Sequence, residues 1–259
     1  MISMKRLIKN ISILLLLGYV GMGIFLYIYQ RDFLYFPTAN IETAYEEMIL
    51  KNENESIHVI VLNRGHENAI LYFGGNAESM ARSADYIAQQ FPAFTVYLMD
   101  YRGYGSSTGE ATEKGIYSDA LKLYDSIKAQ HGRISIGGRS LGSGVAIYVA
   151  SKREVSKLAL ITPFDSIVSV AEERYPLYPV SFLLEDRYDS KSKVKAIKAS
   201  TFIVIAEEDE IISKERTQAL IDAFDPAQLK VTIIKNRGHN DISSDAIYYK
   251  VMQDFIGEG

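Results

Sequence analysis

The chain of 259 residues contains no cysteine. This absence excludes disulfide bonds, thiolate metal sites and a cysteine nucleophile, and it leaves the fold indifferent to the redox state of its compartment. A basic excess is also missing, because Lys and Arg total 28 against 32 Asp and Glu, and no basic stripe runs along the chain. We therefore expect no nucleic-acid partner. The sequence also lacks the phosphate-loop spacing G-x-x-x-x-G-K-[ST], and we expect no cofactor and no metal ion.

The sequence has one long apolar run, from Ile11 to Tyr29, and this run carries no charge. Nineteen helical residues at about 1.5 Å each span nearly 30 Å, roughly one hydrocarbon core. We expect a transmembrane helix over residues 11–29, after an N-terminus over residues 1–10 and before a large domain over residues 30–259. A cleaved signal sequence is the alternative, but the run is long for one and no small-x-small cleavage site follows it.

Charged and aromatic residues flank the apolar run unevenly. Lys5, Arg6 and Lys9 precede it, whereas only Arg31 closely follows it. The positive-inside bias predicts a single-pass membrane protein whose N-terminus is cytoplasmic and whose large domain is extracytoplasmic. Five aromatic residues near its C-terminal end suit an interfacial belt: Tyr27, Tyr29, Phe33, Tyr35 and Phe36.

Beyond Pro37, short apolar runs rich in Val and Ile alternate with helical patterns. The strand candidates are 57–62, 69–73, 94–99, 134–137, 158–162, 201–206 and 231–234. The helix candidates are 79–90, 113–130, 141–151, 214–222 and 244–256. This alternation predicts an α/β fold with a mainly parallel sheet covered on both faces. The short turn at 63–67 suggests an antiparallel hairpin between the first two strands, and the strand-free stretch at 163–198 suggests a small cap.

The strongest motif is Gly138-Arg-Ser140-Leu-Gly142, which lies between a predicted strand and a predicted helix. This is G-x-S-x-G in its required context, where the serine is exposed on a tight turn at the carboxyl end of a sheet. Backbone N–H groups at the start of the helix favour an anion there. A glycine-rich turn without chemistry is the alternative interpretation. The motif predicts Ser140 as a catalytic nucleophile.

A base and an acid follow Ser140 in the order that this type of site requires. His239 is the one histidine after Ser140, and it follows the last predicted strand. The acid is expected after the preceding strand, in the acidic run from Glu207 to Glu210, where we favour Asp209 as the group that orients the imidazole. The alternatives are Glu207, Glu208, Glu210 and, more distantly, Asp165.

The segment Phe73-Gly-Gly-Asn76 ends another predicted strand in two glycines. The backbone N–H groups of Asn76 and Leu141 are our candidates for an oxyanion hole, which stabilises the tetrahedral intermediate of acyl transfer. An ordinary strand-to-helix turn is the alternative.

Five segments together resemble the membrane-anchored, single-pass branch of the α/β-hydrolase superfamily, which has a serine-aminopeptidase-like hydrolase domain. They are FGGNAE at 73–78, DYRGYGSS at 100–107, GRSLG at 138–142, EDEI at 208–211 and GHND at 238–241. The resemblance covers nearly all of residues 31–259 and implies Ser140, Asp209 and His239 as the catalytic triad. Gly74, Ser200 and Ser213 stand where that family usually has His, Pro and Pro.

Three functions fit these motifs. The first is an esterase or thioesterase that cleaves a small-molecule or lipid-like acyl substrate, favoured by the anchor and by the apolar cap. The second is a peptidase or amidase that uses the same triad, in which carboxylates hold the free amine. Candidates for that cluster are Glu78, Asp165, Glu172 and Glu173. The third, disfavoured by the ordered triad, is a non-catalytic binding protein.

Overall fold

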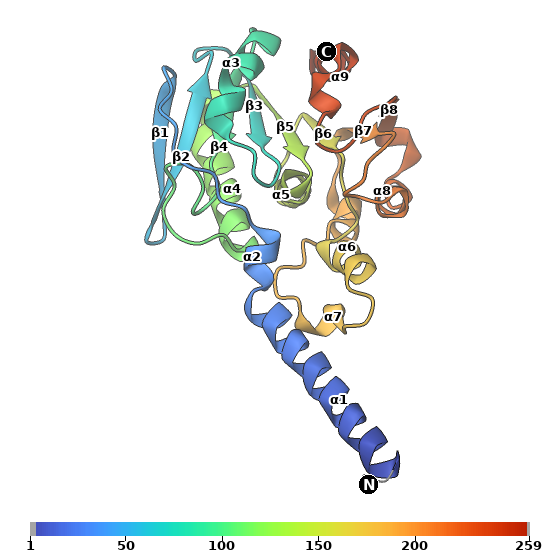
Figure 1. The fold of residues 1–259 in the computed structure, drawn as a ribbon. Coiled ribbons are helices and arrows are strands. Elements are labelled where there is room, and N and C mark those ends of the chain that lie inside the picture. The colour runs from blue at the N-terminus through green and yellow to red at the C-terminus, as the bar shows by residue number, and fades with distance from the viewer. Residues whose placement is uncertain (1–3, 258–259) are drawn as a thin grey trace.

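The sheet at the centre of the fold has eight strands in the spatial order β1-β2-β4-β3-β5-β6-β7-β8 (Figure 1). The computed structural model describes residues 4–257. The strands are β1 Glu46–Asn52, β2 Glu55–Leu62, β3 Asn68–Phe73, β4 Thr95–Met99, β5 Arg133–Arg139, β6 Lys157–Ile161, β7 Ser200–Ala206 and β8 Leu229–Ile234. Strands β3 to β8 run parallel to one another, whereas β2 is antiparallel to β4, and β1 to β2. The predicted mainly parallel sheet is confirmed.

The hairpin expected across residues 63–67 is wrong. This turn connects β2 to β3, but the two strands are not neighbours, because β4 lies between them. The hairpin is instead formed by β1 and β2, whose pairing runs from Glu46 opposite Val61 to Asn52 opposite Glu55. A parallel sheet allows this arrangement, since the connection from β3 to β4 passes through a helix that crosses the sheet.

Helices cover both faces of the sheet, and each face has its own hydrophobic core. The helices of the domain are α3 Met80–Gln90, α4 Glu113–Ile127, α5 Leu141–Lys152, α8 Lys214–Ile221 and α9 Ala246–Gly257, with short 3₁₀ turns η1 Lys128–Gln130, η3 Pro226–Gln228 and η4 Ile242–Ser244. Side chains of strand β2 alternate between the two cores: Val59 and Val61 belong to the core that contains residues of α4 and α5, whereas Ile60 and Leu62 belong to the core that contains residues of α3 and α9.

The N-terminal helix α1, Met4–Ile28, projects away from the domain and leads into the short helix α2, Gln30–Leu34 (Figure 1). Within residues 4–257, α1 is the one helix long and apolar enough to cross a membrane, with a mean hydropathy of 2.3. None of its residues is buried. Its length and composition suit a membrane anchor or a signal sequence. Tyr35 departs from the expected aromatic belt, because it is 5% exposed and its hydroxyl lies 3.0 Å from that of Tyr188 in the core.

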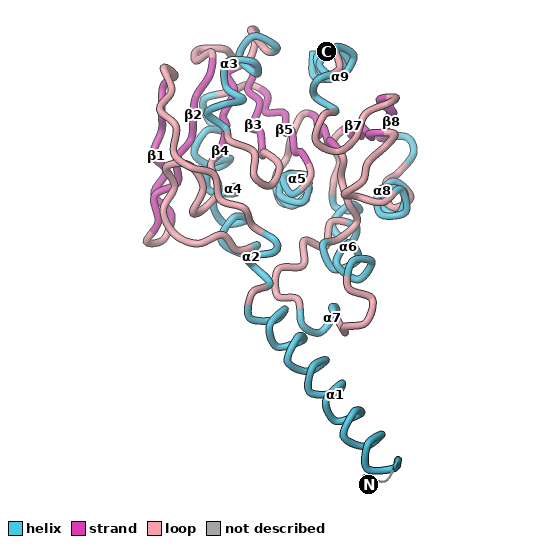
Figure 2. Tube along the Cα trace, viewed as in Figure 1, coloured by secondary structure: helices cyan, strands magenta, loops and turns pink. Residues whose placement is uncertain are grey.

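The cap segment, residues 163–198, connects β6 to β7. It contains α6 Ile167–Arg174, α7 Val180–Leu183 and the 3₁₀ turn η2 Lys191–Ala196. Much of it is loop, and it lies between the sheet and α1 (Figure 2). Arg31 joins α2 to this segment through ion pairs with Glu185 at 2.8 Å and Asp186 at 3.0 Å.

Candidate active site

Ser140 lies in the sharp turn between β5 and α5. Its φ of 49° and ψ of −117° are unusual for a residue with a side chain, and its N–H donates to the carbonyl of Ile161 at 2.9 Å. A Cβ at Gly138 would lie 2.4 Å from the Gly142 oxygen, and one at Gly142 would lie 2.1 Å from the Phe73 oxygen. Both flanking positions of the motif therefore require glycine, and the turn is strained in the way that presents a serine hydroxyl.

The histidine and the carboxylate that the sequence predicts lie in line with Ser140. His239 follows β8 and is 5% exposed, and its Nε2 lies 2.9 Å from Ser140 Oγ. Its Nδ1 lies 2.9 Å and 3.0 Å from the two carboxylate oxygens of Asp209, which follows β7. With a proton on Nδ1, the imidazole donates to Asp209 and accepts from the Ser140 hydroxyl, which is the arrangement that a general base needs.

The acidic run after β7 has distinct roles at each position. Asp209 Oδ1 accepts the backbone N–H groups of Ile211 and Ile212 at 3.0 Å and 2.8 Å, and this fixes the carboxylate. The Glu210 carboxylate accepts the backbone N–H of His239 at 3.0 Å. Glu207 accepts that of Asn236 at 2.9 Å. These neighbours hold the histidine loop by its backbone, and Asp209 alone of the four meets the imidazole.

Asp165, the more distant candidate, is engaged elsewhere. Its carboxylate accepts the N–H of Ser166 at 2.8 Å and pairs with Arg216 at 3.1 Å. Burial raises the pKa of the Asp165 carboxyl, against the influence of these two donors. It forms no hydrogen bond with His239 within residues 4–257.

The candidate oxyanion donors face the same space. Asn76 and Leu141 line the same cavity as Ser140 and His239. The Asn76 side chain is committed: its oxygen accepts from the Phe36 N–H at 2.9 Å and the Tyr104 hydroxyl at 2.7 Å, and its amide donates to the Leu34 carbonyl. Asn76 thus joins the turn after β3 to the end of α2, which its place in the sequence does not reveal.

Arg139 and Glu78 connect the loops of the site, and motif reading alone missed these contacts. Arg139 donates to the carbonyl oxygens of His239 at 3.1 Å and Asn240 at 3.3 Å. Its guanidinium also lies 3.8 Å from Glu78, whose carboxylate accepts the N–H of Gly75 at 2.7 Å. The variable position beside the serine in the G-x-S-x-G motif therefore holds the histidine loop against the turn that carries Asn76.

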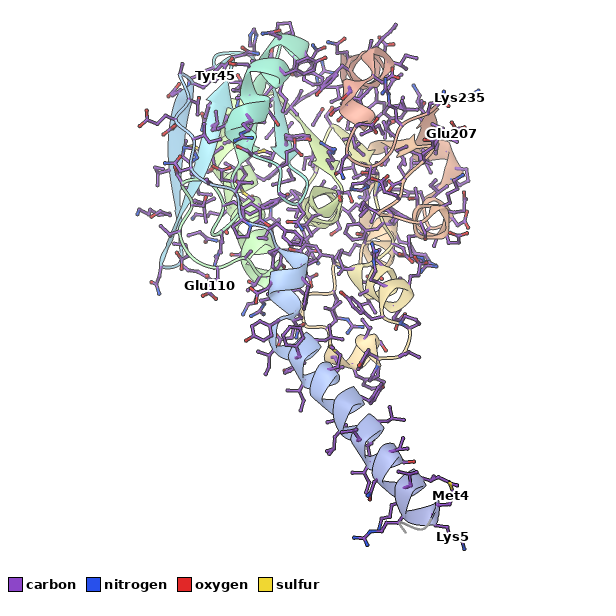
Figure 3. All side chains as sticks on the ribbon, in the orientation of Figure 1. Met4, Lys5, Tyr45, Glu110, Glu207 and Lys235 are labelled. Carbon is purple, nitrogen blue, oxygen red and sulfur yellow. The ribbon has the colours of Figure 1, made fainter. Side chains whose placement is uncertain are left out.

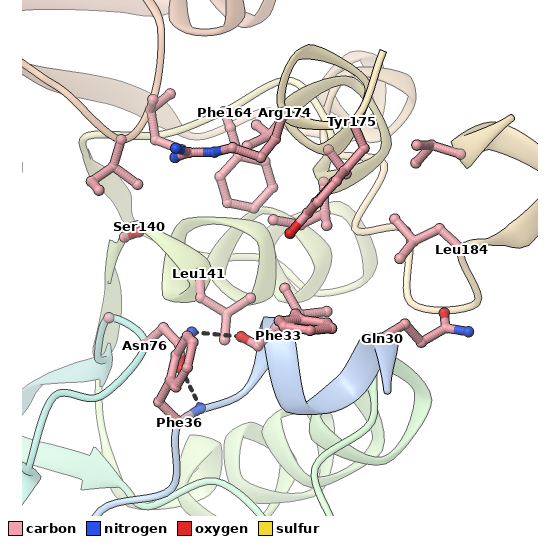
Figure 4. A pocket seen from close by; sticks show the side chains of 18 of the residues that line it. Gln30, Phe33, Phe36, Asn76, Ser140, Leu141, Phe164, Arg174, Tyr175 and Leu184 are labelled. Carbon is pink, nitrogen blue, oxygen red and sulfur yellow. Dashed lines mark hydrogen bonds between the residues drawn. The ribbon is translucent and has the colours of Figure 1, made fainter. Parts of the chain in front are cut away.

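A cavity of about 740 Å³ opens next to Ser140, His239, Asn76 and Leu141 (Figure 4). This volume lies in the upper part of the range for small-molecule sites, roughly 300–1,000 Å³. Apolar side chains from α1, α2 and the cap segment form much of its walls: Leu26, Phe33, Leu34, Phe164, Ile167, Val170, Tyr175, Tyr178, Val180, Leu183 and Leu184. Within residues 4–257, no group of three or more His, Asp or Glu side chains is placed to hold a metal ion.

Comparison with known proteins identifies relatives of this architecture. The family model described as the alpha/beta hydrolase fold matches residues 68–194. The chain is 26% identical over 272 residues to an uncharacterized protein of Mycobacterium tuberculosis, covering 98% of this chain and 95% of that one. It is 26% identical over 268 residues to protein bem46 of Schizosaccharomyces pombe, covering 92% and 89%. An esterase of Pyrococcus furiosus superposes with a TM-score of 0.68 at 18% identity, covering 86% of this chain and 98% of that one.

Proposed function

Since the chain belongs to the α/β-hydrolase superfamily, we propose that it is a membrane-anchored serine hydrolase that cleaves acyl esters or thioesters. The observation that carries this proposal is the continuous line of contacts from Ser140 through His239 to Asp209. Fold alone does not assign a reaction, whereas a nucleophile, a base and an orienting carboxylate at hydrogen-bonding distance do indicate acyl transfer.

Acylation begins when Ser140 Oγ attacks the substrate carbonyl carbon and His239 Nε2 takes the hydroxyl proton. The Asp209 carboxylate keeps the proton on Nδ1 and stabilises the imidazolium. The N–H groups of Asn76 and Leu141 donate to the oxygen as it becomes negative. The carbonyl then re-forms, the bond to the leaving group breaks, and His239 returns the proton to the departing alcohol or thiol.

Deacylation repeats this chemistry with water as the nucleophile. His239 Nε2 removes a proton from the water as its oxygen attacks the Ser140 ester, and it then gives that proton to Ser140 Oγ as the acid leaves. The carboxylic acid product and the free serine complete the cycle.

An ester or thioester is favoured over a peptide because three of the four carboxylates that could hold a free amine are engaged, namely Glu78, Asp165 and Glu173. Glu78 binds the Gly75 N–H. Glu173 lies 2.8 Å from Arg216, which also pairs with Asp165. The walls of the cavity next to Ser140 are largely apolar, as suits an acyl chain.

Turnover measurements on purified full-length protein in detergent test the proposal. We expect hydrolysis of p-nitrophenyl esters and of acyl thioesters, little cleavage of aminoacyl arylamides, and loss of all activity in Ser140→Ala. Undiminished turnover by Ser140→Ala, or cleavage of arylamides without esterase activity, would contradict it. Ser151→Ala, which alters another serine of α5 whose hydroxyl donates to the Tyr148 carbonyl at 2.7 Å, away from the turn at Ser140, serves as the matched control.

Anchoring through α1 and an extracytoplasmic domain complete the proposed function. The support is the length and apolarity of α1 together with Lys5, Arg6 and Lys9 on its N-terminal side. Protease treatment of intact spheroplasts, with an epitope tag after the last residue, tests the orientation. We expect the tag to be digested, and a protected tag would reverse the orientation without removing the anchor.

A further inference from the structure

The C-terminal part of the helix α1, from Tyr19 onward, packs against the cap segment. The ring of Tyr19 stacks on that of Tyr178 with centroids 4.8 Å apart and planes 4° from parallel. The Tyr19 hydroxyl donates to the Leu177 carbonyl at 2.7 Å. Gly23 makes room for this contact, because a Cβ there would lie 3.3 Å from the Tyr178 ring. The anchor is therefore joined to the cap, and it does not act as a free tether.

This packing has a consequence for the depth of the cap in a membrane. Tyr19 lies ten residues before Tyr29, the end of the apolar run, which is about 15 Å along the helix axis. A bilayer that receives the whole apolar run must therefore also receive the part of the cap that contacts Tyr19. If the cap stayed in water, only residues 11–19 of the run would remain in the bilayer, about 14 Å, or half of a hydrocarbon core.

One stretch of the cap segment, residues 175–184, has the chemistry of a membrane-inserted element. Residues 175–184 carry no charge. Leu177 is 77% exposed and Phe182 is 90% exposed, although both are large and apolar. Pro176 and Pro179 have no N–H to leave unpaired. Most other residues of the stretch donate their backbone N–H to a nearby carbonyl oxygen. The donors are Tyr175, Tyr178, Val180, Phe182, Leu183 and Leu184. Backbone groups satisfied in this way tolerate the loss of water that insertion brings.

The cavity beside Ser140 lies directly between these two elements. Its walls include Leu26 of α1 together with Tyr178 and Leu183 of the cap segment (Figure 4 shows the neighbouring Phe33, Tyr175 and Leu184). A cavity walled by a membrane helix and by an apolar cap at the same depth is adjacent to the acyl chains of the leaflet.

We propose that residues 175–184 insert into the leaflet that surrounds the C-terminal half of α1, and that the cavity takes its substrate, a long-chain acyl ester of the bilayer, directly from that leaflet. The insertion rests on the packing of the helix against the cap. The assignment of the substrate rests in addition on the proposed serine hydrolase activity.

The absence of tryptophan from the chain makes insertion directly measurable. Phe182→Trp introduces a single tryptophan in the cap, and Ile247→Trp places one at a 56% exposed position of α9. Helix α9 lies at the end of the domain remote from α1 (Figure 1), and the far end of α1 carries Met4 and Lys5 (Figure 3). With full-length protein in phosphatidylcholine vesicles, we expect a blue-shifted emission for Phe182→Trp and quenching by brominated acyl chains several-fold stronger than for Ile247→Trp. Equal quenching of the two variants would overturn the insertion.

A second pair of variants tests the route of the substrate. Leu177→Asp and Phe182→Asp place a charge on the exposed side of the cap, outside the walls of the cavity, and Ile247→Asp is the matched control. We expect the cap variants to lose at least tenfold in hydrolysis of a long-chain lipid ester held in vesicles, while turnover of soluble p-nitrophenyl acetate stays unchanged. Equal activity of all variants on the vesicle substrate would contradict entry from the leaflet. Failure of the unmodified protein on both substrates would instead contradict the proposed function, and the quenching result would still decide insertion.

Discussion

Asp209→Asn is the substitution whose outcome the geometry determines most closely. Asp209 Oδ1 accepts two backbone N–H groups, from Ile211 and Ile212, and lies 3.0 Å from His239 Nδ1, while Oδ2 lies 2.9 Å from the same nitrogen. An asparagine must place its side-chain oxygen where Asp209 Oδ1 lies, because an NH₂ group there would face the N–H groups of Ile211 and Ile212. Its NH₂ then points at Nδ1, which becomes an acceptor. The imidazole proton moves to Nε2, and His239 can no longer accept the proton of Ser140.

The size of this effect follows from the wrong tautomer. Loss of tautomer control by the same carboxylate-to-amide change costs about 10⁴ in kcat in a serine protease with the same arrangement of Ser, His and Asp, or roughly 5 kcal/mol at 1.36 kcal/mol per tenfold. We expect a loss of this order for a p-nitrophenyl ester in Asp209→Asn, with a melting temperature close to that of the unmodified protein. Glu208→Gln, the same chemical change at the exposed neighbouring position, is expected to keep nearly full activity.

Two results would contradict the role of Asp209 as the group that orients His239. A loss of less than about tenfold in Asp209→Asn would mean that the imidazole is oriented by another group. An equal loss in Glu208→Gln would mean that the loop after β7 presents a different carboxylate to His239.

Three further predictions concern the frame of the site. Gly142→Ala is expected to abolish activity and lower the melting temperature, because the new methyl group would lie 2.1 Å from a backbone carbonyl oxygen at the end of β3. Arg102→Ala removes the ion-pair partner of the fully buried Asp119, which then keeps the Asn52 amide as a donor, and we expect urea denaturation to show a loss of about 3–5 kcal/mol in the free energy of unfolding. The hydrogen bond to Asp100 raises the pKa of His58. The protonated imidazole therefore stabilises the fold fully below the unfolded-state pKa of about 6.5, and this contribution is lost as the pH rises through the higher folded-state pKa. We expect the melting temperature to fall over that pH range, and to fall less steeply in His58→Gln.

Local patterns were sufficient to predict seven of the strands and their alternation with helices along the chain. Runs such as 201–206 and 158–162 are buried on both faces, so their apolar character is continuous and visible in the sequence. β1 is different, because it lies at the sheet edge, where only Leu50 is buried and acidic residues begin the strand. The hairpin across residues 63–67 failed for another reason: a short turn does not reveal that β4 inserts between β2 and β3.

Some residues of the candidate site could also be predicted from the sequence, whereas some of its contacts could not. Ser140, Asp209 and His239 each follow a strand of the sheet, and the carboxyl ends of parallel strands meet at one edge, so strand order is enough to bring them together. The contacts of Arg139 with Glu78 and with the histidine loop depend on how three separate loops fold toward one another. No spacing in the sequence records that approach.

The packing of α1 on the cap is also invisible in the sequence. Tyr19 reads as one more residue of an apolar run, and Tyr178 as part of a proline-rich loop. Their parallel stacking shows that α1 packs on the cap segment, and Leu26 of α1 lines the cavity.

Labelling by a fluorophosphonate tests the central claim, that Ser140 is an activated nucleophile, without requiring knowledge of the substrate. We expect a single covalent adduct by intact-protein mass spectrometry, located at Ser140 by peptide mapping, which is absent in Ser140→Ala and strongly slowed in His239→Ala. A folded protein that remains unlabelled, or an adduct that persists in Ser140→Ala, would contradict it.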